Sequence, residues 1–135
     1  MDKVLNYLAL ARKGGRAELG EEPVGGAARA GKAYLIVVAS DAGDHTWRRA
    51  KSFVAGTDQQ CIKLPYTKEE MGLVTGRGSL AIAAITDAAL ALAMVRSLDK
   101  VDAAVVEMLT YKTNRFKRRQ QEAKAHQRNV RKGKK

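Results

Sequence analysis

The sequence predicts an α/β fold, a three-layer domain of helices around a central sheet, followed by a basic C-terminal helix or tail. Apolar runs of strand length alternate along the chain with segments of helical periodicity. Hydrophobic residues are 45% of the 135 residues and aromatic residues only 5%, so the core must consist mainly of Leu, Val, Ile and Ala. Alternating elements of this kind pack helices onto a sheet.

The individual elements follow from local signals. The continuous apolar run 34–39 indicates a central strand covered on both faces. Thr67 and Glu70 form a capping-box pattern, which predicts a helix start. Gly25 and Gly26 lie inside an expected helix and cost about 2 kcal/mol relative to alanines. The expected elements are helix 3–12, a short extended piece at 16–19, helix 20–30, strand 34–39, helix 44–55, strand 61–64, a helix from 67 to about 74, strand 80–85, and a helix capped by Thr86 or Asp87 that runs to 98.

The alternation of strands and helices ends near residue 99, which predicts a domain over 1–99 and an extension over 100–135. The charge of the two parts differs strongly. The net charge is +11, and residues 112–135 hold 11 Lys and Arg against one acid, Glu122. The rest of the chain is nearly neutral, with 14 basic and 13 acidic residues. Apolar residues at helical spacing over 101–116 predict a further helix that continues into the basic run, and 131–135 are expected to be disordered.

A strongly basic extension favours a polyanionic partner. Residues 112–119 combine five cations with one aromatic residue, Phe116, and Arg can both pair with phosphate and stack on bases. The predicted contacts here are Lys112, Arg115, Lys117, Arg118 and Arg119. The alternative is a charged tail that serves only solubility.

Other classes of protein find little support. The single cysteine, Cys61, permits no intrachain disulfide and is expected to be a small buried residue. The start of the chain does not resemble a secretory signal, and the apolar stretch 80–95 is too short to span a bilayer, so we expect a cytoplasmic protein. We expect neither metal nor cofactor, because His45 and His126 lack partners at zinc-site spacing.

Catalysis is also not expected. Glu21-Glu22 and Glu69-Glu70 are adjacent pairs, and neighbours along a helix diverge rather than converge on one bond. The glycines of segment 72–78 lie between a helix and a strand, whereas phosphate-binding loops lie between a strand and a helix.

Five motifs follow one another in a recognisable order, at 9–16, 20–22, 31–42, 65–72 and 84–87. Together they resemble the bacterial YlxQ-like branch of the kink-turn RNA-binding ribosomal protein family, relatives of the archaeal L-seven-Ae and eukaryal L-thirty-e proteins. The resemblance covers about residues 3–98. The family implies an α-β-α sandwich with a mixed four-stranded sheet that binds bent RNA stems at one end. One contact is the segment entering the second helix, and the other is the loop before the last strand.

Carried over residue by residue, the first segment is partly retained. Gly20 matches the family glycine and is followed by Glu21, but Glu22, Pro23 and Gly26 stand where Asn, Glu and Lys are common. An acid cannot replace the amide donor, and glycine cannot replace the cation.

The loop before the last strand fits better. Arg77, Gly78, Ser79 and Leu80 offer one cation, flexible backbone and an apolar tip, which suit contact with an RNA loop. The alternative is an ordinary helix-to-strand connection. Lys32 can reach a phosphate, but a solvated surface lysine explains it equally well.

The leading hypothesis is a non-catalytic RNA-binding protein of the translation apparatus. It would be a monomer whose domain docks on structured RNA, ribosomal RNA in particular and kink-turns included, and ribosomal proteins are candidate partners. The alternative is a protein-interaction module with only non-specific RNA affinity. An RNA-modifying enzyme is a weaker third hypothesis, since it would need a second domain.

Overall fold

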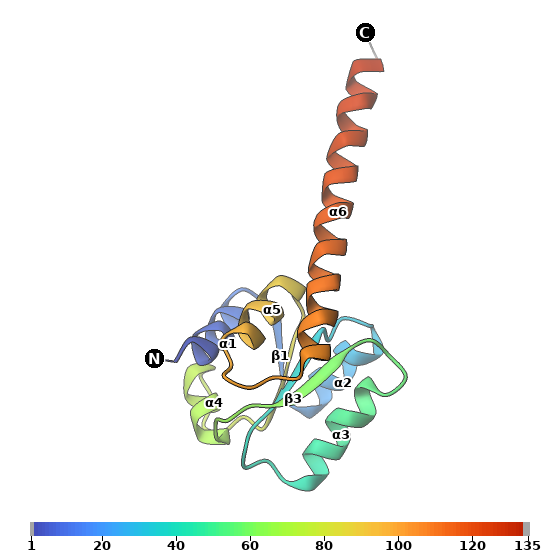
Figure 1. Cartoon of the computed structure of the whole chain (residues 1–135). Coiled ribbons are helices and arrows are strands. Elements are labelled where there is room, and N and C mark those ends of the chain that lie inside the picture. The colour runs from blue at the N-terminus through green and yellow to red at the C-terminus, as the bar shows by residue number, and fades with distance from the viewer. Residues whose placement is uncertain (1, 134–135) are drawn as a thin grey trace.

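A mixed four-stranded sheet lies between two layers of helices (Figure 1), which confirms the predicted fold class. The computed structural model describes residues 2–133, with side chains over 2–125. The elements are α1 (Lys3–Lys13), β1 (Ala17–Leu19), α2 (Glu21–Arg29), β2 (Leu35–Val38), α3 (Asp44–Val54), β3 (Gln60–Lys63), α4 (Lys68–Val74), β4 (Ile82–Ile85), α5 (Ala88–Arg96) and α6 (Ala103–Gly133).

The sheet has the strand order β1-β4-β2-β3, and its register defines two ends of the domain. β2 runs parallel to β3 and antiparallel to β4, and β1 is also antiparallel to β4. Val38 therefore lies opposite Ile82, and Leu35 opposite Ile85. The strands β1 and β2 finish, and β4 begins, at the same end of the sheet, which we call the Gly20 end. We call the opposite end of the sheet the Tyr34 end.

Each face of the sheet covers its own core. Leu35 and Val37 point into a core shared with α1, α4, α5 and the start of α6. Ile36 and Val38 point into a second core shared with α2 and α3. Because successive residues of a strand face opposite sides, burial on both faces explains the unbroken apolar run of β2.

Local signals fix the helix starts. Thr67 and Glu70 form the predicted capping box of α4. Asp87 caps α5, since its carboxylate accepts a hydrogen bond from the amide of Leu90 at 2.9 Å. The glycines inside α2 have a packing reason: a Cβ on Gly25 would lie 3.1 Å from the Phe53 ring. Glycine at this position lets α2 and α3 approach closely, which offsets its low helix propensity.

Several boundaries differ from the sequence prediction. β4 begins at Ile82 rather than at Leu80, and β3 begins one residue earlier than expected. α5 ends at Arg96, before Leu98. The helix α6 continues to Gly133, through most of the segment expected to be disordered, and residues 134–135 lie outside the described residues.

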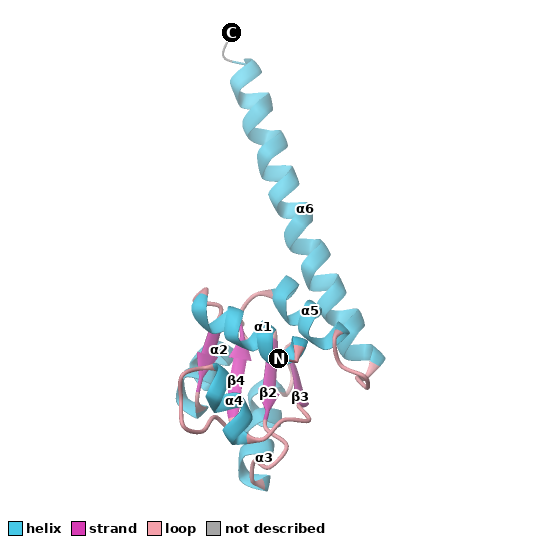
Figure 2. Ribbon diagram, turned by 90° about the vertical axis from the view of Figure 1, so that its left-hand side faces the viewer, coloured by secondary structure: helices cyan, strands magenta, loops and turns pink. Residues whose placement is uncertain are grey.

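The long helix α6 joins the domain through its first turns and then leaves it (Figure 2). Val105 and Leu109 are buried in the same core as α5, so that core extends past residue 99. From Asn114 to Ala125 every side chain is exposed. Within the described part of the chain, no helix is both long enough and apolar enough to cross a membrane.

Candidate nucleic-acid interface

The two segments predicted to contact RNA meet at the Gly20 end. Gly20 directly precedes α2 with a φ of 95°, a conformation that favours glycine, and its amide donates to the carbonyl of Ile82 at 3.0 Å. A Cβ placed on Gly20 would lie 3.4 Å from the Arg77 Nη1 atom. The turn after β1 and the loop before β4 therefore form one continuous surface.

The loop before β4 is tightly held against α4. The amide of Arg77 donates to the carbonyl of Gly72 at 2.9 Å. A Cβ on Gly72 would lie 2.8 Å from the backbone nitrogen of Ser79, so only glycine fits. Gly76 has a φ of 74°, which reverses the chain after α4. Arg77, Gly78 and Ser79 are left exposed, as a contact with a ligand requires.

Two side chains of this region differ from the prediction. Leu80 is only 2% exposed and belongs to the core, so the expectation that it forms an exposed apolar tip is wrong. The exposed apolar side chain nearby in sequence is Leu73 of α4, at 81%. Arg12, which no sequence pattern marks as a contact residue, places its guanidinium 3.5 Å from the Cβ position of Gly76. Arg12 is distant from Arg77 in sequence, so only the fold shows that both border Gly76.

The acids of α2 have different surroundings. The Glu21 carboxylate accepts a hydrogen bond from Arg49 Nε at 2.6 Å, and His45 lies 3.9 Å away. Arg49 itself stacks over Phe53. Glu22 is exposed. The Arg49 pairing reduces the negative charge that Glu21 presents to a phosphate.

The predicted cations of the extension divide into two groups. Lys112 forms an ion pair with Asp58, in the loop between α3 and β3, and this ammonium group is the main reason why the pKa of Asp58 lies below its ordinary value. The ion pair of Lys112 therefore links α6 to the domain. Arg115, Lys117, Arg118 and Arg119 are exposed, and none of them forms an ion pair among the side chains described over 2–125.

Lys32 and the extension lie at the Tyr34 end. Lys32 is exposed just before β2, and residues 113–120 of α6 border Tyr34 and Thr86. The register places both of these positions at the edge opposite Gly20 and Arg77. The predicted contact residues thus form two surfaces at opposite ends of the sheet, an arrangement that the sequence does not indicate.

The described residues contain one free cysteine and no candidate metal site. No group of three or more His, Cys, Asp or Glu residues suited to a metal ion occurs in the described part of the chain. Cys61 is half-buried against the α3 side of the sheet, and burial raises the pKa of its thiol. A raised pKa keeps the thiol protonated and unreactive.

Comparison with known proteins gives structural neighbours only. No protein-family model matches the chain, and no curated protein does. A protein of unknown function from Bacillus halodurans C has a similar structure, with a TM-score of 0.68 and 23% identity over 74% of this chain and 100% of the other. The 15.5kD RNA binding protein of Giardia lamblia has a TM-score of 0.50 and 17% identity, over 80% of this chain and 82% of the other. Likeness at these identities shows a shared fold.

Proposed function

We propose that this chain is a non-catalytic RNA-binding protein that belongs to the YlxQ-like branch of the kink-turn-binding family and acts in the translation apparatus of the cytoplasm. The observation that carries the proposal is the exposed, cationic surface of α6. Arg115, Lys117, Arg118 and Arg119 face solvent without a described acidic partner. Such cations bind phosphates and release the counterions condensed on RNA.

The Gly20 end supplies the second contact. Arg77 and Arg12 flank Gly76, and the exposed backbone of Gly78 and Ser79 lies beside them. These two guanidinium groups partly compensate for the amide and the lysine that are replaced by Glu22 and Gly26. Arg is well suited to pair with phosphates and with guanine edges. The Giardia lamblia neighbour is named an RNA binding protein, and its similar fold supports this part of the proposal.

The two surfaces lie at opposite ends of the domain and therefore contact different segments of RNA. The Gly20 end would dock on a bent stem, while α6 would follow the backbone of an adjoining helix or strand. A structured RNA such as ribosomal RNA offers both within a short distance. In this arrangement the domain determines specificity, and α6 determines most of the salt-dependent affinity.

Arg77→Ala tests the role of the Gly20 end, with Arg96→Ala as a matched control. Both arginines are exposed, but Arg96 belongs to α5, outside the segments that carry the predicted RNA contacts. We expect Arg77→Ala to weaken binding to a stem bent by tandem sheared G·A pairs by about 1–3 kcal/mol, with little effect on an unbent duplex. Titrations of fluorescent RNA measure both affinities. Equal losses on the two RNAs would contradict docking through this loop.

A protein-interaction module remains the second candidate, and one observation favours it. Leu73 is almost fully exposed on α4, beside the loop that carries Arg77. Apolar patches rimmed by polar residues mark protein contacts, and Leu73 would lie at the centre of such a contact. Wild-type protein that binds bent and unbent RNA equally would favour this candidate over specific RNA recognition.

A further inference from the structure

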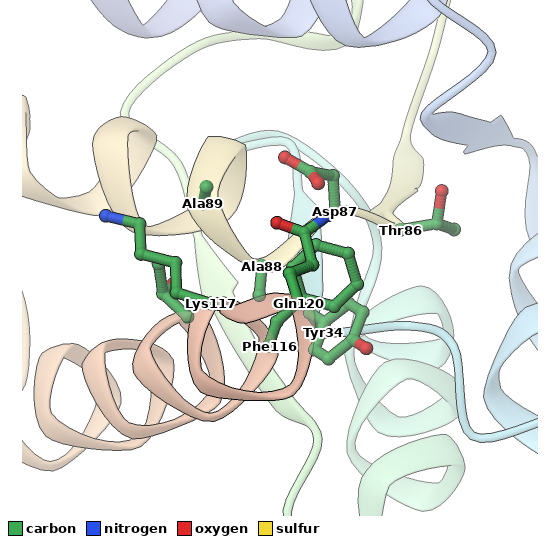
Figure 3. A pocket seen from close by; sticks show the side chains of 9 residues that line it. Tyr34, Thr86, Asp87, Ala88, Ala89, Phe116, Lys117 and Gln120 are labelled. Carbon is green, nitrogen blue, oxygen red and sulfur yellow. The ribbon is translucent and has the colours of Figure 1, made fainter. Parts of the chain in front are cut away.

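Two hollows at the Tyr34 end share an aromatic wall made of Tyr34 and Phe116. The larger one has a volume of about 340 Å³, and the smaller one about 140 Å³. Other side chains lining the larger hollow are Thr86, Asp87, Ala88, Ala89, Thr113, Lys117 and Gln120, and those lining the smaller one are Lys112, Arg115 and Arg119. Figure 3 shows the larger hollow, with Asp87 and Gln120 on one side and Lys117 directed away from Tyr34.

The larger hollow exists because small residues of α5 face α6 at the point where α6 leaves the domain. Thr113, Phe116, Lys117 and Gln120 recur at helical spacing and form the face of α6 that borders α5. The first turn of α5 presents only Ala88 and Ala89 to this face. Thr113 is still buried, whereas Gln120 is exposed, so the space opens toward solvent along α6.

The aromatic wall is available to a ligand. Phe116 is 56% exposed although it lies against the domain, and Tyr34 is half-buried on the core side. Flat aromatic faces next to cations are the recurring element of sites for unpaired bases, because every base can stack on them. Duplex RNA cannot use such a wall, since its bases are already stacked on one another.

The two hollows differ in charge. The smaller one is lined by Lys112, Arg115 and Arg119 and by no acid, whereas the larger one combines Lys117 with Asp87. Arg115 and Arg119, four residues apart on α6, line the smaller hollow. Asp87 lines the larger one, where one carboxylate oxygen caps α5 and the second is directed to no described donor. A nucleotide has the same polarity: its phosphates need cations, and the amino groups of its bases need acceptors.

We propose that the aromatic wall binds one unpaired RNA base, with the base stacked on Phe116 and Tyr34. The edge of the base faces Asp87 and Gln120, and the adjoining phosphates contact Arg115 and Arg119. The inference rests on the proposed RNA-binding function and adds to it a class of ligand, single-stranded RNA next to a structured element. It also assigns the Tyr34 end a base contact in addition to its phosphate contacts.

Phe116→Ala in the full chain tests the proposal, with Tyr111→Ala as the matched control. Tyr111 is also 56% exposed and lies on α6 among arginines, but it borders neither hollow. The probes are a 12-nucleotide single-stranded RNA of mixed sequence that contains 2-aminopurine, whose fluorescence is quenched by stacking, and a blunt RNA duplex of the same length. Phe116→Tyr serves as the conservative variant.

We expect Phe116→Ala to weaken single-strand binding about fivefold or more and to reduce the 2-aminopurine quenching, with less than about twofold change for the duplex. Tyr111→Ala should leave both affinities within about twofold, and Phe116→Tyr should restore single-strand binding. If Phe116→Ala weakens both probes equally, or if Tyr111→Ala has the same effect, the base site is wrong while RNA binding stands. Wild-type protein that binds neither probe would overturn the proposed function as well.

Discussion

Gly72 shows how one residue positions the loop that carries Arg77. A Cβ at this position would lie 2.8 Å from the Ser79 nitrogen and 2.9 Å from the Arg77 carbonyl oxygen, and both atoms belong to the backbone. Neither can move away by a change of side-chain rotamer. The loop must therefore shift as a whole if any side chain is added at residue 72.

We expect Gly72→Ala to lower the free energy of unfolding by about 1–3 kcal/mol, because the added methyl group overpacks a closed contact. Gly78→Ala is the matched control in the same loop, since nothing lies within 4 Å of its Cβ position and its φ is not positive. Its effect should stay within about 0.5 kcal/mol. Urea denaturation measures both. Equal stabilities for the two variants would show that the loop is not held against α4.

Asp58 provides a pH-dependent contact between α6 and the domain. Its pKa lies below the ordinary 3.8, mainly through the hydrogen bond from Lys112. A carboxylate with a lowered pKa in the folded state stabilises it above the unfolded-state pKa, and this contribution is lost as the pH falls through the folded-state pKa.

We expect Asp58→Asn to cost less than about 1 kcal/mol at pH 7, because the Asp58 side chain is 51% exposed and solvent screens the pair. The difference from wild type should shrink as the pH falls below about 4 and vanish once Asp58 is protonated. Urea denaturation at pH 7, 5 and 3 measures it. A difference that grew toward low pH would contradict the assignment of the ion pair.

At the scale of elements, α6 consists of two parts with different roles. Its first turns bury Val105 and Leu109 against α5, and beyond Thr113 its described side chains are exposed. The exposed part has few opposite charges to pair along the helix, and like charges four residues apart, such as Arg115 and Arg119, disfavour the helical state. Phosphates bound along this part would relieve the repulsion.

Leu109→Ala tests the docking of α6. The side chain is 1% exposed, so we expect a loss of about 2–5 kcal/mol in the free energy of unfolding. Tyr111→Ala, on an exposed face two residues away, should change it by less than about 0.5 kcal/mol. Denaturant unfolding followed by circular dichroism compares the two. A loss below 1 kcal/mol for Leu109→Ala would mean that α6 is not part of the core.

The sequence predicts elements better than it predicts contacts between them. The capping box at Thr67 and the apolar run of β2 are local signals, and the structure confirms both. β1 has only three residues, and the sequence predicts no more than a short extended piece at this position. The sequence predicts Leu80 as a loop tip because it follows a glycine-rich segment. Its burial depends on how α4 and β4 pack together, and no local sequence pattern indicates that packing. The proximity of Arg12 to Gly76, and of Tyr34 to Phe116, likewise follows only from the packing of α1 against α4 and of α6 against the domain.

At the scale of the molecule, the domain and its extension place their contact residues far apart. Arg77 lies at one end of the sheet, while Arg115 and Arg119 lie on a helix that leaves the other end (Figure 1). A single straight duplex is a poor fit to both surfaces at once. Under the proposed function, both surfaces would be occupied by an RNA that holds a bent stem next to a strand or helix.

The most direct measurement compares the full chain with a chain ending at Asn114, on the bent stem and on the unbent duplex, across a salt series. This cut retains the buried residues of α6, whereas a cut at residue 99 would uncover α5. We predict that the shorter chain loses much of the dependence of log affinity on log salt but keeps the preference for the bent stem. An unchanged salt dependence, or a preference that disappears with the cut, would contradict the division of roles between the domain and α6.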